Sequence, residues 1–509
     1  MRVGRFCNSR AMTEPASPSP PPTPPAPEDR LVKTYHSAVV GGRELAYTVS
    51  CGTIVLREES EKTKGDDEGA SEGEKPRAEV SVIAYTLDSV ENRGDRPVTF
   101  AFNGGPGSAS VWLHLGLLGP RRAPVTEGVT TGPFRLVDNE HSLLDVSDIV
   151  FIDPVSTGYS RAVIGEKAKQ FHGFQRDIES ISEVIRLWTT RNRRWTSPKF
   201  LIGESYGTTR GAGVAAHLQE RYGLFLNGLM LVSGALDFGQ LEFDNGNDAP
   251  YVGFLPTYAA TAWYHGRLAP DLQADLRATV AEAERFAVEE YAVALAKGAR
   301  LPDDERARII TQLARLTGLS EDYIDRTDLR IVDQRFFKEL LRDERRTVGR
   351  LDSRFKGIDR DAAGEHAEDD ASFGATMAPF AATFNDYVRG DLGFETDRTY
   401  EILHPNLWKT WSYADHENKY VNVGELLRKT VSGNPGLHVF VASGYYDLAT
   451  PHFTTDIVID HLALDRTLRG NVTTAYYEAG HMMYIHEPSL AALKADLAAF
   501  IARAIPSRD

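Results

Sequence analysis

Short apolar runs that end in polar or glycine residues recur along the chain and predict buried strands. They lie at 97–103, 148–153, 199–203, 226–234, 437–444 and 473–480. Runs of this length without alternation are typical of strands covered on both faces of a sheet. Residues 175–190, between two of these runs, have helical spacing. Because strands alternate with helices, the pattern predicts an α/β fold with a mostly parallel central sheet flanked by helices.

The segments before these runs have a different character. Residues 44–56 and 78–87 are rich in β-branched and aromatic side chains and are predicted as strands. Residues 57–77, between them, are charged and contain glycine, which predicts a mobile loop because such a segment buries little apolar surface. Residues 1–30 include a Pro/Ser-rich tract and are predicted as a disordered tail.

The pattern changes again between residues 240 and 395. Residues 273–298 and 303–316 have helical spacing and strong helix formers, and no buried-strand run occurs in this region. We therefore expect an α/β core, residues 31–239 and 396–509, interrupted by a helical cap insertion at 240–395.

Composition restricts the classes of function. The 57 Lys and Arg against 72 Asp and Glu give a formal net charge of −15, which disfavours binding to nucleic acid or to a membrane surface. No apolar run approaches the roughly 20 residues that span a bilayer. Two cysteines, Cys7 and Cys51, cannot form a disulfide framework, and no CxxC or HExxH pattern is present. We expect no cofactor and no metal site.

The first residues contain no apolar stretch of the length of a secretory signal. As the sequence is written, the expected location is the cytoplasm, and export is the alternative if the true N-terminus differs. The pattern does not predict an oligomeric state.

The stretch KFLIGESYGTTR, residues 199–210, suggests a nucleophile. It contains a G-x-S-x-G elbow, with a predicted strand before it and a helical pattern after it. Glycines suit the tight strand-to-helix turn, and the helix N-terminus directs its amides at the place where negative charge would develop. Ser205 is the candidate nucleophile. The alternative is a glycine-flanked helix entry with an ordinary N-cap serine.

The last third of the chain supplies the partners that such a serine needs, in the required order. Asp447 follows one apolar run and His481 follows the last one. His481 would take the serine proton, while Asp447 would orient the imidazole and stabilise its charged form. His452 and His486 also lie in this region and are expected to pack or cap structure.

The loop FNGGPGSAS, residues 102–110, follows another predicted strand. Its consecutive glycines allow a close backbone approach, so it is the candidate source of an oxyanion-hole amide. A purely structural Gly-Pro loop is the alternative.

The motifs together resemble the serine carboxypeptidase family, the group of carboxypeptidase Y and the wheat enzymes, in its bacterial branch. They are NGGPG at 103–107, DP at 153–154 with GYS at 158–160, GESYG at 203–207 and GHM at 480–482. The sequence departs from the eukaryotic members at Ala101, Ser108 and Met483-Tyr484, where those members have Trp, Cys and Val-Pro.

The resemblance implies an α/β-hydrolase fold and release of C-terminal residues from peptide substrates through an acyl-enzyme. It implies a triad of Ser205, Asp447 and His481. It further implies an oxyanion hole formed by the backbone amides of Gly105 and Tyr206. A substrate-carboxylate site formed by Asn103, Gly104 and Glu204 is implied as well.

Three alternatives to the carboxypeptidase stay open. An α/β-hydrolase aminopeptidase of the prolyl or tripeptidyl type also combines GGPG with the elbow, and an esterase or acyltransferase would use the same triad. A catalytically silent binding protein is the third.

Glu204 is an unexpected neighbour for a nucleophile, because an ionised carboxylate would oppose a developing oxyanion. A carboxyl held near another carboxylate and away from water shifts toward its neutral form. A protonated Glu204 beside Asn103 would donate a hydrogen bond to the terminal carboxylate of a peptide. Alternatively, the glutamate is merely tolerated at this position of the elbow.

Overall fold

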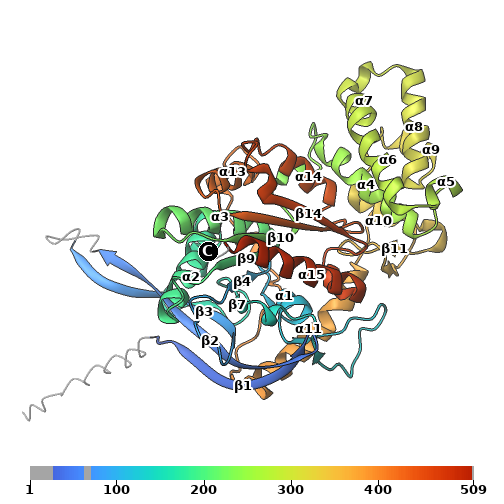
Figure 1. The fold of residues 1–509 in the computed structure, drawn as a ribbon. Coiled ribbons are helices and arrows are strands. Elements are labelled where there is room, and N and C mark those ends of the chain that lie inside the picture. Colours follow the sequence, from blue (N-terminus) through green and yellow to red (C-terminus); the bar gives the residue numbers. More distant parts are fainter. Residues whose placement is uncertain (1–26, 62–69, 507–509) are drawn as a thin grey trace, which may run out of the picture.

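A twisted ten-stranded sheet forms the centre of the molecule, with helices on both of its faces (Figure 1). The computed structural model describes residues 27–61 and 70–506. In spatial order the strands are β1 (Arg30–Val40), β2 (Arg43–Glu61), β3 (Ser71–Leu87), β7 (Asp148–Ile152), β4 (Val98–Phe102), β9 (Lys199–Ser205), β10 (Gly228–Gly234), β13 (His438–Gly444) and β14 (Val472–Tyr477), and β8 (Arg161–Ala162) pairs with β3.

The sheet divides into a parallel and an antiparallel part. All neighbours from β7 to β14 pair in parallel, whereas β1, β2, β3 and β7 pair antiparallel. Strands β4, β7 and β10 are buried along their whole length, because helices cover both faces. The predicted strands and the mostly parallel α/β sheet are confirmed. Strand β1 was not predicted.

Each face of the sheet has its own apolar layer of helices. One layer contains α2 (Phe174–Arg191), α3 (Tyr206–Tyr222), α13 (Gly424–Gly433) and α14 (His452–Asp460). The other contains α1 (Val111–Leu113), α11 (Ala371–Gly390) and α15 (Glu487–Ala504). Shorter elements are α12 (Leu407–Thr410) and the ribbons β5 (Arg121–Arg122) with β6 (Val137–Asp138) and β11 (Thr347–Val348) with β12 (Lys356–Gly357).

A bundle of helices projects from one end of the sheet (Figure 1). It consists of α4 (Ala249–Tyr264), α5 (Pro270–Gln273), α6 (Leu276–Phe286), α7 (Ala292–Lys297), α8 (Asp303–Thr317), α9 (Glu321–Arg326) and α10 (Asp333–Glu339). Its apolar side chains form a separate cluster, which runs from Tyr251 to Val348 and also includes Leu448 from the loop after β13. Helix α11 lies within the predicted insertion, 240–395, but its Phe380, Phe384 and Tyr387 pack in the layer against the sheet. The predicted insertion therefore consists of two differently packed parts.

The prediction of a mobile loop at 57–77 is wrong at both of its ends. Strand β2 continues to Glu61 and β3 begins at Ser71, with Glu58 opposite Lys75. The antiparallel ladder satisfies the backbone groups while the charged side chains stay in water, so no buried apolar face is required. The rest of this loop, 62–69, lies outside the described residues.

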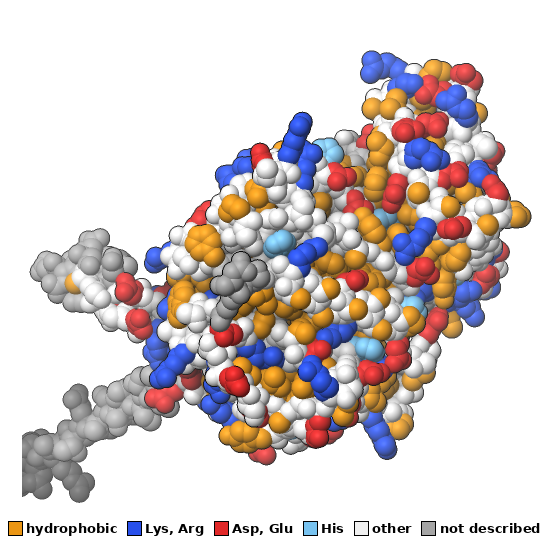
Figure 2. All heavy atoms as spheres, viewed as in Figure 1, with side chains coloured by type: hydrophobic (Ala, Val, Ile, Leu, Met, Phe, Trp, Pro, Cys, Tyr) orange, Lys and Arg blue, Asp and Glu red, His pale blue; other side chains and the backbone are white. Residues whose placement is uncertain are grey.

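The predicted disordered tail, 1–30, lies mostly outside the described residues as well. Its last residues are ordered: the Asp29 carboxylate accepts the Val55 backbone N–H at 2.8 Å, and Arg30 begins β1. Cys51 is buried and free, and Cys7 lies outside the described residues. Across 27–61 and 70–506, no helix is both long and apolar enough to cross a membrane. On the face seen in Figure 2, basic and acidic side chains are interspersed.

Candidate active site

Ser205 lies at the turn between β9 and α3 in a backbone conformation that non-glycine residues rarely adopt, with φ 61° and ψ −131°. The flanking glycines make this turn sterically feasible. A Cβ on Gly203 would lie 2.1 Å from the Gly207 carbonyl oxygen, and one on Gly207 would lie 2.9 Å from the Phe102 carbonyl oxygen. The elbow therefore requires glycine at both positions, and it holds the serine away from its own strand and helix.

Thr208, in the first turn of α3, holds this strained turn in place through two hydrogen bonds. Its hydroxyl donates to the Ser205 carbonyl at 2.7 Å and accepts the Ala235 backbone N–H at 2.8 Å. The turn is thereby tied to the residue that follows β10.

His481 and Asp447 are brought together from loops that follow β14 and β13. Their Nδ1 and Oδ2 atoms are 2.7 Å apart, and both side chains are buried. The other Asp447 oxygen accepts the backbone N–H groups of Ala449 and Thr450 at 2.8 and 3.0 Å. The carboxylate is thus held in one orientation, with its second oxygen directed at the imidazole.

The pKa of His481 reflects two opposing influences. Burial disfavours the charged imidazolium, but the charge and the hydrogen bond of Asp447 outweigh it, and the pKa of His481 is raised. The His481 carbonyl accepts from the Ser233 hydroxyl at 2.7 Å, and its backbone N–H donates to the Leu351 carbonyl. Both ends of the residue are anchored, so the ring is presented to the cavity from a fixed backbone.

The loop 103–107 lies directly against the elbow. A Cβ on Gly104 would lie 2.5 Å from the Tyr206 nitrogen, so only glycine permits this approach. Gly105 has φ +105°, which also favours glycine. The Tyr206 amide belongs to the first turn of α3, where N–H groups have no intrahelical acceptor.

Asn103 joins this loop to the residue before the serine. Its side-chain amide donates to Glu204 Oε1 at 3.0 Å, and its carbonyl oxygen accepts the Leu113 backbone N–H at 3.1 Å. The Asn103 backbone carbonyl accepts from Arg210, whose guanidinium forms a buried ion pair with Asp177 at 2.7 Å. Neither Arg210 nor Asp177 was identified from the sequence.

Glu204 is a buried carboxyl with unusual acidity. Burial raises the pKa of Glu204 to about 7, and the Asp447 charge acts in the same direction. His481, Tyr484 and Asn103 lower it, but less strongly. Although Tyr484 lies near this carboxyl, no hydrogen bond of good geometry reaches Glu204 Oε2 or the Tyr484 hydroxyl from the described residues. One buried carboxyl oxygen is therefore left without a protein partner.

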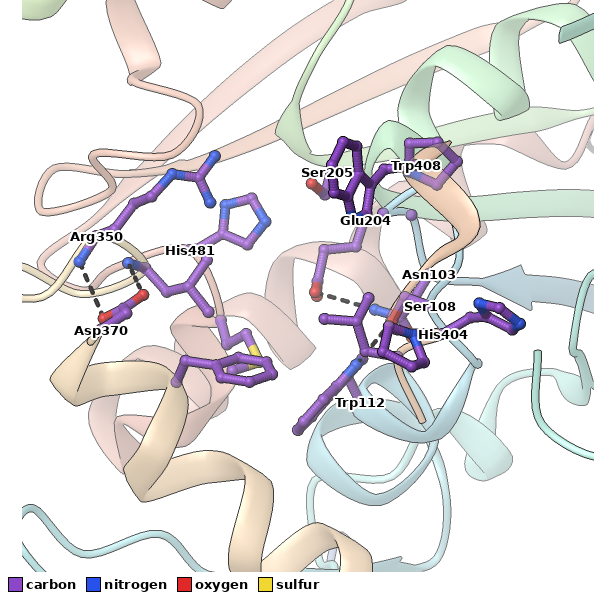
Figure 3. Close-up of a pocket in the computed structure, with 18 residues that line it drawn as sticks. Asn103, Ser108, Trp112, Glu204, Ser205, Arg350, Asp370, His404, Trp408 and His481 are labelled. Atoms are coloured by element: carbon purple, nitrogen blue, oxygen red, sulfur yellow. Dashed lines mark hydrogen bonds between the residues drawn. The ribbon is translucent and has the colours of Figure 1, made fainter. Parts of the chain in front are cut away.

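A cavity of about 450 Å³ contains Asn103, Gly104, Gly105, Glu204, Ser205 and His481 in its lining, so residues from three separate segments meet there. In Figure 3, Ser205 and Glu204 lie across the cavity from His481 and Arg350. The remaining walls include side chains that were not among the predicted site residues. They are Trp112, Arg350, Leu351, Asp370, Phe373, Leu403, His404, Trp408 and Met482.

The wall residues show which part of the predicted insertion, 240–395, reaches the cavity. The cavity lining includes Arg350, Leu351, Asp370 and Phe373 of the insertion, whereas none of its described lining residues comes from helices α4 to α10. The insertion therefore reaches the cavity only through the segment that returns to the sheet.

The DP and GYS motif, 153–160, has a structural role in this arrangement. Asp153 is buried and accepts the backbone N–H and the hydroxyl of Ser110 at 2.8 and 2.7 Å. Gly158 packs so closely that a Cβ there would lie 1.9 Å from the Asp153 carboxylate. The motif fixes the start of α1 behind the loop 103–107.

Comparisons with known proteins find carboxypeptidases among the proteins similar to this chain. The serine carboxypeptidase family model matches residues 79–290. Two Arabidopsis thaliana proteins, serine carboxypeptidase-like 7 and serine carboxypeptidase-like 5, are 30% and 28% identical to this chain over 132 and 146 residues. The matched segments cover 25% and 28% of this chain and 29% and 32% of the relatives, about a third of their length.

A solved structure extends the likeness in fold. KEX1(delta)p, a prohormone-processing carboxypeptidase from Saccharomyces cerevisiae, superimposes with a TM-score of 0.52 at 16% identity, covering 91% of this chain and 92% of that one. At this identity the match shows the α/β-hydrolase fold alone. Three of the four sequence motifs, including the Ser205 elbow, lie within the matched residues 79–290, so over this part of its length the chain is similar to the serine carboxypeptidase family.

Proposed function

We propose that this protein is a serine-type carboxypeptidase that releases C-terminal amino acids from peptides. Ser205 attacks the carbonyl carbon of the last peptide bond, and His481 accepts the serine proton and then donates it to the departing amino acid. Asp447 holds the imidazole tautomer through the 2.7 Å contact with Nδ1. Water then releases the acyl group from Ser205 by the reverse sequence of proton transfers.

The backbone amides of Gly105 and Tyr206 are proposed as the oxyanion hole. The tight approach of the loop 103–107 to the elbow supports this role, because the two amides belong to segments in direct contact. Loss of one such donor typically costs about 3 kcal/mol of transition-state stabilisation.

The observation that carries the carboxypeptidase proposal is the Asn103–Glu204 pair beside Ser205. At a pKa of about 7, Glu204 carries a proton in a substantial fraction of molecules at neutral pH. The proton can reside on Oε2, which has no hydrogen-bond partner among the described residues. A peptide carboxylate in the cavity would supply that partner, with Asn103 and the Gly104 backbone completing the site.

The test is hydrolysis of an N-acylated dipeptide, with the released products identified from both ends. We expect release of the C-terminal amino acid by the wild-type protein, no release by Ser205→Ala, and covalent labelling of wild-type Ser205 alone by a fluorophosphonate. Cleavage restricted to peptides with a free N-terminus would instead indicate an aminopeptidase. Turnover of esters without turnover of acylated dipeptides would indicate an esterase, and either result would overturn the proposal.

A further inference from the structure

Three potential metal ligands meet at a position outside the catalytic cavity. Glu284 comes from α6 of the projecting bundle, and His452 and Asp456 come from α14 in the layer against the sheet. One donor atom from each residue lies within 4.8 Å of the other two. The cluster therefore lies where the bundle meets the sheet layer, and it joins residues 168 positions apart in the chain.

The geometry of His452 is that of an oriented ligand. The side chain is fully buried, its Nδ1 lies 3.3 Å from the Thr257 hydroxyl, and its Nε2 lies 3.0 Å from Glu284 Oε1. Metal-bound histidines characteristically have a partner on the second ring nitrogen, which fixes the tautomer. Thr257 is in position to act as that partner and leave Nε2 for an ion.

Asp456 follows His452 by one helical turn, so both side chains emerge on the same face of α14. The Tyr476 hydroxyl donates to Asp456 Oδ1 at 3.0 Å. A hydrogen bond of this kind orients a ligating carboxylate and leaves its other oxygen free.

The charges at the cluster also suit a cation. Two carboxylates, Glu284 and Asp456, face a single imidazole. Arg277 lines the neighbouring cavity, but among the described residues it forms no ion pair with either carboxylate. The Arg277 guanidinium lies over the Tyr445 ring, 5.9 Å from its centroid. The Arg277 guanidinium thus contacts an aromatic ring and leaves the charge of the two carboxylates uncompensated by it.

A cavity of about 460 Å³ opens onto the cluster, with Glu284, Asp456, Asp460 and Tyr476 in its lining. None of the described residues that line it also lines the catalytic cavity. This space gives an ion a route of entry and gives water molecules room to complete its coordination.

We propose that Glu284, His452 and Asp456 bind a divalent transition-metal ion, with Zn²⁺ as the best match, and that the ion fastens the helical bundle to the sheet layer. One imidazole nitrogen with two carboxylate oxygens is a donor set typical of zinc and its neighbours, whereas calcium and magnesium prefer oxygen ligands alone. The ion would take the place of the proton shared between His452 Nε2 and Glu284 Oε1.

The experiment is a calorimetric titration of the full chain, freed of metal by chelator and dialysis, with Zn²⁺ alone. A parallel titration with Co²⁺ follows the visible absorption of bound cobalt. We expect one ion per chain and a higher unfolding temperature with Zn²⁺. Glu284→Gln and Asp456→Asn should each weaken Zn²⁺ binding by at least about 100-fold, since each removes a direct ligand and not only an outer partner.

The matched control is Asp460→Asn, which alters a carboxylate on the same helix and in the same cavity but outside the cluster. It should leave the affinity within about twofold of wild type. Glu284 has a side chain one-third exposed, and glutamine retains a partner for His452, so this variant should fold. Circular dichroism and fluorophosphonate labelling without metal check the fold. No Zn²⁺ binding by the wild type, or equal binding by both ligand variants, would overturn the proposal.

Discussion

Replacing Glu204 by glutamine separates the proposed roles of its proton and its shape. Glutamine keeps a hydrogen-bond donor at every pH, whereas the glutamate donates only while it is protonated. The pKa of Glu204 is raised to about 7, so the donor of the wild-type protein is present below pH 7 and is lost as the pH rises through that value. His481 acts in the opposite sense, because it is the proposed catalytic base and is needed in its neutral form.

The magnitude follows from the titration. The protonated fraction of Glu204 falls from about one half at pH 7 to about one hundredth at pH 9. If only the protonated form binds the peptide carboxylate, kcat/KM falls about 50-fold over that range. A hydrogen bond to a charged group contributes about 1.5–3 kcal/mol, which corresponds to about 10- to 150-fold in rate, a range that includes this figure.

The assay compares kcat/KM for an N-acylated dipeptide between pH 5 and 9 in wild type and Glu204→Gln. The ratio of variant to wild type should rise about 50-fold between pH 7 and pH 9. The matching dipeptide amide is the control, since it has no carboxylate and its ratio should stay constant. A ratio independent of pH for the free acid would refute the reasoning, as would the same rise for the amide.

Three further substitutions test other parts of the site. Gly203→Ala places a Cβ 2.1 Å from the Gly207 carbonyl oxygen and should lower the free energy of unfolding in urea by about 3 kcal/mol or more, whereas Gly470→Ala, with nothing within 4 Å, should change it by less than about 0.5 kcal/mol. Asp447→Asn should reduce kcat by about 10⁴-fold. It should also lower the His481 pKa, which moves the acid limb of the remaining kcat/KM profile to lower pH. An acid limb that does not shift would contradict the contact between Asp447 and His481. Tyr484→Phe removes a group that lowers the Glu204 pKa, so the alkaline decline should move to higher pH, and a decline at lower pH would show the opposite role.

The parts of the fold predicted from the sequence are those whose burial leaves a local pattern. Strands β7, β9 and β10 of the parallel block are buried along most or all of their length, so each appears as a continuous apolar run. Strand β1 lies at the edge of the sheet, and its Leu31 and Tyr35 are 45% and 76% exposed, so no buried run marks it. Helix α11 was assigned to the insertion because nothing local shows that its Phe384 packs against the sheet layer.

The residues of the site likewise divide into those that a local sequence pattern marks and those that it does not. Ser205 and the loop 103–107 lie in short motifs whose steric demands are local, and the glycine contacts give the physical reason for those motifs. The cavity walls depend on segments that the fold brings from far away, such as Arg350 and Trp408. Arg210 sits inside an ordinary helical pattern, and only the folded chain shows that it holds the Asn103 backbone.

In the proposed mechanism, Glu204 and His481 need protons in opposite states, and the two groups influence each other. The His481 charge lowers the pKa of Glu204, and the Glu204 charge raises that of His481. The titrations of the two groups are therefore coupled, and a pH profile reports the pair and not either group alone. A substrate carboxylate beside Glu204 adds negative charge, which raises the Glu204 pKa and draws the proton to that carboxyl. The C-terminus of a peptide therefore favours the protonated form of Glu204 that donates to it, whereas a peptide amide, which carries no charge, does not.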